Sequence, residues 1–274
     1  MGQALALDLL KSSAHVWGLR RDYYALREVE RKGVRPLMAD LLQPKELADL
    51  PEVDFVVLCQ APSEPSDNYQ KTYYEGTQNI LAALKKRHPQ KLIFVSSTSV
   101  YATNDGSWVD ESMSSLSSAY RTKEEEARAS CLLEAEKLVL SNGIPSVVFR
   151  LGGIYGPHRN RLGALKEGRM KPIFSDDYSN RIRVEDAVRG IRILMEKGKP
   201  GEIYLGVDDE PATQNEFYGW VCEKLALEKS GGTKPDFSHG SNKRCSNKKI
   251  KLLGLILKYP NFREGYSDLL KEVL

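Results

Sequence analysis

Short apolar runs alternate with amphipathic stretches along the first 155 residues. An apolar helical face with members at every third or fourth position runs from Asn68 to Arg87, and a second stripe runs from Leu132 to Leu140. Five runs have the length and composition of strands: HVWGL, GVRPLMAD, VDFVVLCQA, KLIFVSS and IPSVVFRLG. Strands that alternate with helices need crossover connections, so the pattern predicts a parallel sheet in an α/β fold. The unbroken apolar run VDFVVLCQA predicts a strand covered on both faces.

The pattern changes after Tyr155. GPHRNRLGALKEGRMKP is basic and is predicted to be a loop, whereas RIRVEDAVRGIRILMEKG predicts a short strand leading into a helix. GEIYLGVDDEPATQNEFYGWVCEKLAL repeats strand, turn and helix, with Thr213 as the expected N-cap and Glu216 completing a capping box. EKSGGTKPDFSHGSNKR predicts a polar loop, and FREGYSDLLKEVL predicts a last amphipathic helix.

The chain opens in a helix-like pattern. GQALALDLL has the apolar spacing of a buried helix, with no strand before it. A sheet that binds a dinucleotide places a glycine-rich turn between its first strand and first helix, because glycines let backbone N–H groups approach the pyrophosphate. Gly2 stands where the last glycine of G-x-x-G-x-x-G would fall. Alternatively, Gly2 is only the residue that follows the start methionine.

Composition narrows the class of protein. The 274 residues are 41% hydrophobic and carry 40 basic and 37 acidic side chains, a balance that argues against a nucleic-acid or membrane-surface partner. Cys59, Cys131, Cys222 and Cys245 form no C-x-x-C pair, so neither a metal site nor a disulfide framework is expected. No apolar run reaches membrane-spanning length, and the N-terminus lacks the layout of a secretion signal. We therefore expect a cytoplasmic protein.

Six stretches, in this order, resemble the extended short-chain dehydrogenase/reductase superfamily, specifically its NAD(P)-dependent epimerase/dehydratase group: GQALALDLL, ADL, YYEGTQNILAAL, SSTSVYA, FRLGGIYGP and NRIRVEDAVRGI. The stretches VDDEPATQNEFYGWV and KRCSNKKIKLLG resemble an atypical branch described as sugar-nucleotide epimerases. The resemblance implies a doubly wound, Rossmann-like parallel sheet. Residues 1–155 would form the NAD(P)-binding domain, and residues 156–274 a small α/β substrate-binding region interleaved with the last strands.

Within this family the first strand lies at the centre of the sheet. Here that strand and most of the glycine-rich turn are missing from the sequence. Unpaired backbone groups are costly when buried. We therefore expect either further residues upstream in the natural protein or an unstable chain.

The resemblance also assigns cofactor positions. NAD-binding members end the second strand with an acid that holds the ribose, whereas this chain has Arg20 and Arg21 there, a pair that suits the 2′-phosphate of NADP better than NAD. Alternatively, both arginines could simply be solvent-exposed side chains at the end of a strand. Thr77 and Asn79, on the following helix, could serve core packing or cofactor contact. The other cofactor-binding positions implied are Gly2, Asp40, Leu41, Cys59, Gln60, Ala61, Arg150 and Tyr155.

Active members of the family use Ser or Thr, Tyr and Lys, with Tyr and Lys four residues apart on one helical face. Ser97, with Thr98 beside it, stands four residues before Tyr101, which is the family position; local capping is the alternative role. Aligning LLEAEKLVL on the family helix puts Arg128 at the tyrosine position and Leu132 at the lysine position, so the pair is lost. Arg128 could hold an anionic group, and Tyr101 could stand in as the acid/base. Tyr120 and Lys123 are only three residues apart.

Downstream, His158 to Arg161 form a basic loop where the family's substrate diphosphate often binds, although a solvated loop explains it equally. Arg183 replaces a family histidine, and Asp186 is expected to position backbone or cap a helix. Two functions remain open. One is an NADP-dependent epimerase, dehydratase or reductase acting on a nucleotide sugar or similar small molecule. The other is a non-catalytic NADP-binding sensor or interaction protein. Family precedent allows a homodimer through the helices of 68–87 and 128–140.

Overall fold

The computed structural model describes residues 1–62, 68–113, 120, 122–229 and 242–271. These divide into two compact units. Unit 1 comprises Met1–Ser96, Ser130–Phe149 and Ile191–Ile203, and unit 2 comprises Ser97–Ala129, Arg150–Gly190 and Tyr204–Leu274. The units are interleaved along the chain. The sequence suggested a boundary after residue 155, with the later region interleaved with the last strands. That boundary stays a prediction about which region binds cofactor and which binds substrate.

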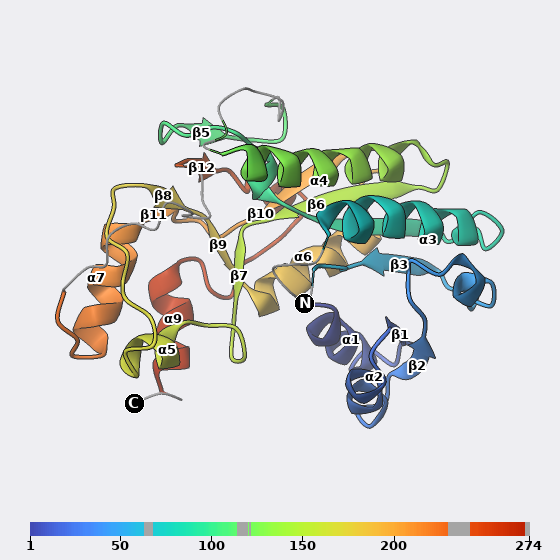
Figure 1. Cartoon of the computed structure of the whole chain (residues 1–274), viewed down its shortest axis with the longest axis horizontal. Helices are drawn as coiled ribbons and strands as arrows, with labels where there is room; N and C mark the ends of the chain where they lie inside the picture. Colours follow the sequence, from blue (N-terminus) through green and yellow to red (C-terminus); the bar gives the residue numbers. More distant parts are fainter. Residues whose placement is uncertain (63–67, 114–119, 121, 230–241, 272–274) are drawn as a thin grey trace. The chain divides into compact units, whose positions relative to one another are not determined.

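The elements up to Ser97 alternate between helix and strand (Figure 1). They are α1 (Gly2–Leu10), β1 (Trp17–Arg20), α2 (Tyr23–Glu30), β2 (Arg35–Met38), the 3₁₀ turn η1 (Pro44–Leu47), β3 (Phe55–Leu58), the π-helical turn η2 (Gln70–Glu75), α3 (Gly76–Leu84) and β4 (Lys91–Ser97). The expected strands are all present at these positions. The predicted helix of 68–87 is also present, as η2 followed by α3.

The remaining elements include several that cross from one unit to the other. They are η3 (Thr98–Val100), β5 (Trp108–Val109), α4 (Lys123–Ser141), β6 (Ser146–Leu151), β7 (Gly153–Tyr155), α5 (Leu162–Lys166), β8 (Tyr178–Ser179), β9 (Arg181–Arg183), α6 (Val184–Lys197), β10 (Ile203–Gly206), β11 (Ala212–Thr213), α7 (Gln214–Lys224), β12 (Arg244–Cys245), α8 (Lys248–Leu252) and α9 (Phe262–Leu270). The predicted capping box of α7 is confirmed, because Thr213 accepts from the Glu216 amide and Glu216 from the Thr213 amide.

The central sheet is parallel, with the strand order β10-β6-β4-β3. β3 pairs with β4 so that Phe55 lies opposite Lys91. β1 and β2 form a separate parallel pair, with Trp17 opposite Arg35 and Arg20 opposite Met38. This α/β architecture confirms the predicted fold class.

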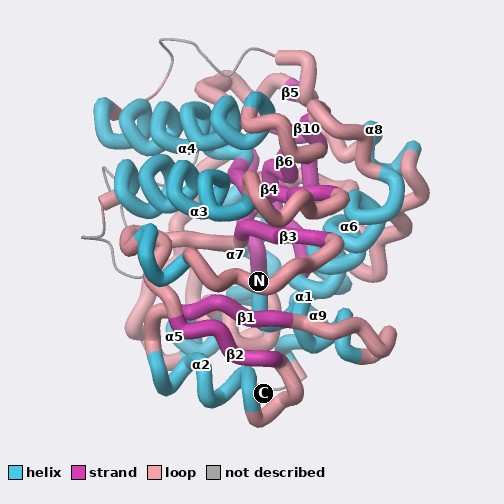
Figure 2. Tube along the Cα trace, turned by 90° about the vertical axis from the view of Figure 1, so that its right-hand side faces the viewer, coloured by secondary structure: helices cyan, strands magenta, loops and turns pink. Residues whose placement is uncertain are grey.

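Unit 1 is layered (Figure 2). Helices α3 and α4 cover one face of the sheet, and α1 and the end of α6 lie on the other. Lys91 at the start of β4 donates through Nζ to the carbonyl oxygens of Leu194 and Met195 in α6. Arg192 of α6 forms an ion pair with Asp8 of α1, at 2.9 Å. These contacts hold the second helical layer against the strands.

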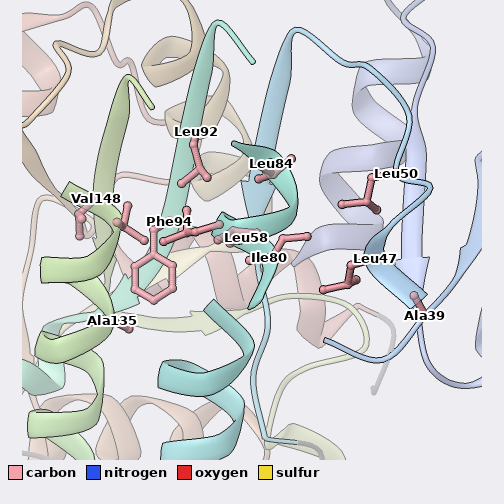
Figure 3. Packing of buried hydrophobic residues seen from close by; sticks show 12 residues of the cluster. Ala39, Leu47, Leu50, Leu58, Ile80, Leu84, Leu92, Phe94, Ala135 and Val148 are labelled. Atoms are coloured by element: carbon pink, nitrogen blue, oxygen red, sulfur yellow. The ribbon is translucent and has the colours of Figure 1, made fainter. Parts of the chain in front are cut away.

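A single apolar cluster fills the space between the sheet and α3 and α4 (Figure 3). Leu92 and Phe94 of β4 are fully buried, and they meet Ile80 and Leu84 of α3 and Val139 of α4. Burial of each such side chain is worth roughly 1.5–3 kcal/mol, so this cluster is a main source of unit 1's stability.

Two predictions about local structure were wrong, and one helix was not predicted. β3 is only half-buried except at Leu58, although its unbroken apolar run predicted cover on both faces. α2 was not predicted; Asp22 caps it by accepting from the Ala25 amide at 2.6 Å. The basic stretch expected to be a loop contains α5, whose Leu162 and Leu165 are buried in the core of unit 2. Most of the loop expected at EKSGGTKPDFSHGSNKR lies outside the described residues.

Candidate functional site

The start of α1 lies beside the carboxyl end of β3 in unit 1. A Cβ atom added to Gly2 would lie 3.7 Å from the Cβ of Cys59, the residue that follows β3. Gly2 itself is exposed. The first backbone N–H groups of a helix have no partner within the helix and point along its axis, and they attract anions. The binding of a phosphate group at Gly2 stays a prediction from the sequence.

The loop after β3 is braced by α3. Gln60 donates through Nε2 to the hydroxyl of Thr77, at 2.7 Å. Thr77 is fully buried, so its role is to support this loop from within the core. Ala61 is exposed. Of the two roles considered for Thr77, core packing and cofactor contact, its full burial favours core packing.

Cys59 follows β3, and its thiol is desolvated. Desolvation raises the pKa of its thiol to about 11, and the nearby N-terminal amine opposes this only in part. At neutral pH the thiol is protonated, and the thiolate is the reactive form of cysteine. The raised pKa argues against a reactive role for this thiol, and the contact of Cys59 with a cofactor stays a prediction.

The loop after β2 is held by the same helix. Asn79 donates through Nδ2 to the carbonyl oxygen of Leu41, at 2.9 Å. A Cβ on Gly76 would lie 3.3 Å from the Cβ of Leu41, so the small residue lets α3 approach this loop closely. The Asp40 carboxylate accepts from the Leu42 amide at 2.9 Å, which fixes the turn. Asp40 and Leu41 are both half-buried at the position expected for adenine contact.

Arg20 ends β1 and has an acidic neighbour. The pKa of Glu28 in α2 is lowered, first by hydrogen bonds from Lys32 and Gln3 and then by the charges of Lys32 and Arg20. The Glu28 carboxylate is 2.8 Å from Lys32 Nζ and 3.0 Å from Gln3 Nε2. Arg20 is half-buried and Arg21 is exposed. Glu28 thus links the start of α1 to α2, and the positive charge of Arg20 helps to stabilise its carboxylate.

In unit 2, Ser97 caps the turn that follows β4. Its Oγ accepts from the Ser99 amide at 3.1 Å, which is the local capping that was the alternative role for this serine. The side chain remains half-buried, and its own hydroxyl hydrogen is not used in that bond. Thr98 is 7% exposed, and its side chain forms a hydrogen bond with the Cys245 thiol. Burial raises the pKa of that thiol to about 12.

Tyr101 and Arg150 are buried together. The Arg150 guanidinium lies 4.8 Å from the centre of the Tyr101 ring, and the two side chains are 3% and 1% exposed, respectively. Burial raises the pKa of Tyr101 to about 12, with the Arg150 charge opposing the shift. A tyrosine so placed stays protonated and out of reach of solvent, which favours packing over acid/base work.

Tyr120 was considered in the sequence only as half of a pair with Lys123. Its hydroxyl donates to the carbonyl oxygen of Val100 at 2.7 Å, inside the turn that Ser97 caps. It is half-buried, and burial together with the Glu126 charge raises its pKa, against the charge of Arg150. Because α4 begins only at Lys123, no spacing rule for a helical pair could have found this contact.

Arg128 and Leu132, which the resemblance aligns with the family's tyrosine and lysine, both lie on α4. Leu132, at the lysine position, is 3% exposed in the core. Arg128, at the tyrosine position, is half-buried on α4. The pKa of Glu124 is lowered mainly by a backbone hydrogen bond and a hydrogen bond from Thr122, and the Arg128 charge adds a smaller contribution. Within the described residues no group of His, Cys, Asp and Glu is arranged to hold a metal ion.

Tyr155, expected beside a nicotinamide, lies in the core of unit 2. Its ring stacks on Tyr266 with centroids 4.5 Å apart, and its buried hydroxyl finds no hydrogen-bond partner among the described residues. Burial raises its pKa well above the usual range, with the Asp208 charge adding to the shift. Arg183, which stands in place of a family histidine, is buried and bonds Glu185 at 2.9 Å and the Gly265 carbonyl oxygen.

Asp186 has the structural role expected of it. It is fully buried, and its two carboxylate oxygens accept from the amides of Lys258 and Tyr259, at 2.7 and 2.8 Å. It therefore positions backbone in unit 2.

Comparison with known proteins gives the family. The profile of the NAD dependent epimerase/dehydratase family matches residues 1–205. The chain belongs to this family. The 2-alkyl-3-oxoalkanoate reductase of Shewanella oneidensis is 25% identical over 249 residues, covering 82% of this chain and 64% of the reductase. The dTDP-glucose 4,6-dehydratase of Streptomyces griseus is 27% identical over 165 residues, covering 57% of this chain and 49% of the dehydratase. The epimerase/dehydratase chain thus spans about half to two thirds of the length of these relatives.

A solved structure supports the fold of the epimerase/dehydratase family. DesIV, a dTDP-glucose 4,6-dehydratase from Streptomyces venezuelae solved with NAD and TYD bound, has a TM-score of 0.83 against this chain, at 19% identity. The match covers 98% of this chain and 92% of DesIV. None of the described helices is long and apolar enough to cross a membrane.

Proposed function

We propose that this chain binds a nicotinamide dinucleotide at the carboxyl ends of β1, β2 and β3. The observation that carries the proposal is the approach of Gly2 to Cys59, which brings an exposed helix start to the end of a parallel strand. Parallel α/β sheets bind dinucleotides at this edge, with the pyrophosphate at the helix start. Asn79 and Gly76 hold the Leu41 loop where the adenosine half would lie.

NADP is the preferred cofactor in this proposal. Arg20 ends β1, and Arg21 follows it, where an acid would favour the free ribose hydroxyl of NAD. A guanidinium group offers paired N–H donors to a phosphate, which supports a 2′-phosphate partner. The Glu28 carboxylate interacts electrostatically with Arg20 and accepts a hydrogen bond from Lys32. Lys32 therefore partly offsets the negative charge of Glu28 before any ligand binds.

The substrate proposed is a nucleotide sugar or a related small molecule. Support comes from the family itself and from the named activities of its relatives, a reductase and a dTDP-glucose dehydratase. When bound, the dinucleotide would supply or accept a hydride. Ser97 would donate its hydroxyl hydrogen to a substrate oxygen, with Thr98 beside it, and Arg128 would hold an anionic substrate group.

A non-catalytic role is the second candidate, and the position of Leu132 favours it. A buried leucine replaces the lysine that lowers the tyrosine pKa in active members, and Tyr101 has a raised pKa. Tyr120 is then the tyrosine left to move a proton beside the Ser97 turn, and its pKa is also raised. A chain with these groups would hold the dinucleotide and turn over slowly or not at all.

Two measurements test these candidates in order. Calorimetric titration with NADPH, NADP, NADH and NAD tests binding, and we expect the phosphorylated pair to bind at least tenfold more tightly. Incubation with 4-deuterated NADPH and a panel of nucleotide sugars then tests turnover by mass spectrometry. Transfer of label that is lost in Ser97→Ala supports an enzyme, and tight binding without transfer supports the non-catalytic role. Absence of binding to all four dinucleotides would contradict the proposal.

A further inference from the structure

Arg244 of β12 packs against two aromatic rings in unit 2. β12 pairs in parallel with β5 (Figure 1), and Arg244 lies directly opposite Trp108 in that pair. The guanidinium carbon of Arg244 is 5.2 Å from the centre of the Trp108 ring and 4.9 Å from the centre of the Tyr178 ring. Its Nε donates to the carbonyl oxygen of Gly106, at 2.7 Å. The fold therefore holds the guanidinium group in place before any ligand arrives.

The groups that position Arg244 are themselves fixed by Asn242. Its Oδ1 accepts from the amide of Tyr178 at 2.9 Å, which joins two segments 64 residues apart. Its carbonyl oxygen accepts from the amide of Gly106, also at 2.9 Å. Gly106 has a φ of +79°, a conformation that favours glycine, so the loop before β5 is built for this contact. The Tyr178 ring and the Gly106 carbonyl oxygen thus have defined positions beside Arg244.

Arg244 has hydrogen-bond donors to spare. A guanidinium group carries five N–H donors, and the bond to Gly106 uses only the one on Nε. The two terminal nitrogens form no hydrogen bond or ion pair with any residue that the structure describes. Asp105, the acid next to Gly106 in sequence, instead accepts from the Ser107 amide at 3.0 Å. Arg244 therefore offers an ordered pair of nitrogens, and a guanidinium group binds phosphate through two parallel N–H···O bonds.

Trp108 adds a flat apolar surface beside these donors. Its side chain is 52% exposed, although the next residue, Val109, is buried. Nucleobases stack on exposed aromatic rings whatever their sequence, because every base has a π-face. An exposed indole next to an ordered guanidinium group therefore matches a ligand that carries both a base and a phosphate.

This surface is distinct from the turn at Ser97. Successive side chains of a strand point to opposite faces, so Arg244 and Cys245 point in opposite directions from β12. Cys245 is buried, and its thiol forms a hydrogen bond with Thr98, which follows Ser97. Arg244 therefore lies on the face of β12 that is turned away from Thr98.

We propose that Trp108, Tyr178 and Arg244 form a binding site for a nucleoside monophosphate. The phosphate accepts from the terminal nitrogens of Arg244, and the base stacks on the exposed indole of Trp108. Tyr178 keeps the guanidinium group in position. All three residues belong to unit 2, and none of them takes part in the proposed dinucleotide or substrate contacts, so this inference does not rest on the proposed function.

The test uses the full isotope-labelled chain, titrated with adenosine monophosphate and followed by nuclear magnetic resonance. The chain has three tryptophans, whose indole N–H resonances are separate probes, and Trp108→Phe identifies the resonance of Trp108 by removing it. We expect the nucleotide to shift the Trp108 resonance. The resonance of Trp220, whose ring packs 5.6 Å from that of Phe262, should not move. Adenosine and inorganic phosphate should each bind about tenfold more weakly or worse, because each makes only part of the contacts.

Variants measured by calorimetry separate the two halves of the site. Arg244→Ala should lower the affinity for adenosine monophosphate by about tenfold or more, and Arg244→Lys, which keeps the charge but not the paired donors, by about fivefold. Trp108→Ala should lower it by about fivefold or more, whereas Trp108→Phe keeps a ring and should stay within about threefold. Arg169→Ala removes an exposed arginine elsewhere in unit 2 and should have no effect. The resonance shift in the wild type does not depend on the stability of any variant.

The proposal fails if adenosine monophosphate leaves the Trp108 resonance unmoved, even if it binds elsewhere on the chain. It fails equally if adenosine or inorganic phosphate binds as tightly as the nucleotide, or if Arg169→Ala weakens binding as much as Arg244→Ala. A shift caused by a polyglutamate peptide and not by the nucleotide would make an acidic protein the ligand and would also overturn it. Arg20→Ala, which weakens the proposed dinucleotide site in unit 1, should leave the shift intact, so the two proposals can fail separately.

Discussion

Asn79 on α3 donates through its side-chain amide to the backbone oxygen of Leu41, 2.9 Å away, and so fixes the loop that follows β2. The bond joins residues 38 positions apart in sequence and orients a loop at the carboxyl edge of the strands. Asn79→Leu removes the donor and leaves the half-buried carbonyl unpaired, which typically costs about 1–3 kcal/mol. We expect NADPH affinity to fall by about fivefold or more, measured by fluorescence titration.

The matched control for this substitution is Gln78→Leu, one position earlier on the same helix and exposed. It should leave NADPH affinity within a factor of two. Equal losses in both variants would mean that Asn79 acts through helix stability and not through the Leu41 loop.

Arg20 and Glu28 should affect the two cofactors differently. Arg20→Ala removes a charge proposed to contact a 2′-phosphate, so NADPH affinity should fall by about tenfold or more while NADH affinity changes little. Glu28→Gln removes an opposing charge from the field of Arg20 and should strengthen NADPH binding modestly, most clearly at low salt. Calorimetric titration measures both.

Arg31→Ala, an exposed arginine at the end of α2, is the charge-matched control for Arg20. A parallel loss of NADPH and NADH affinity in Arg20→Ala would count against the assignment of Arg20 to the phosphate.

The thiol of Cys59 should respond to pH in a defined window. Its pKa is raised from 9.0 to about 11 in the folded chain, so the folded state favours the protonated form. The resulting stability is fully present below pH 9 and is lost as pH rises through about 11. Alkylation of Cys59 by iodoacetamide, followed by mass spectrometry, should be slow at pH 8 and increase steeply only above pH 10.

Cys59→Ala should make the free energy of unfolding less dependent on pH between 9 and 11. An alkylation profile with its midpoint near that of free cysteine, about 8.5, would contradict the burial of this thiol.

A buried hydrogen bond joins β4 to α4 in unit 1. Ser96 donates through Oγ to the Glu136 carboxylate at 2.6 Å, and both residues are buried. Ser96→Ala removes one partner of a buried carboxylate, which we expect to cost about 1.5–3 kcal/mol in urea unfolding. Ser99→Ala, at an exposed serine nearby in sequence, should stay within about 0.5 kcal/mol of the wild type.

The order of strands and helices could be predicted from the sequence because apolar periodicity reports local burial. KLIFVSS became β4, and Thr213 with Glu216 became a capping box, since both depend on neighbouring residues. α2 was missed although Asp22 gave a capping signal, because its eight residues carry only two buried side chains, Leu26 and Val29. α5 was missed because its apolar pair sits in a basic stretch.

What could not be predicted depends on contacts between distant segments. The apolar sequence of β3 predicts a strand that is covered on both faces. In the structure β3 is half-buried, and no described strand lies along one of its edges. The burial of Tyr101 under Arg150 and the bond from Tyr120 to Val100 join positions with no common motif. Family resemblance placed Ser97 at a strand end and left local capping as an alternative role, and the structure identifies the Ser99 amide as the group that is capped.

The most direct test of the account is an NADPH titration of the wild type and Gly2→Val, each with its melting temperature. A Cβ at Gly2 makes only ordinary contact with Cys59, so the substitution leaves the fold intact, while the added methyl groups block the approach of a phosphate to the start of α1. The account predicts unchanged melting temperatures and a loss of NADPH affinity of about tenfold or more in Gly2→Val. Equal affinity in the two proteins would contradict it.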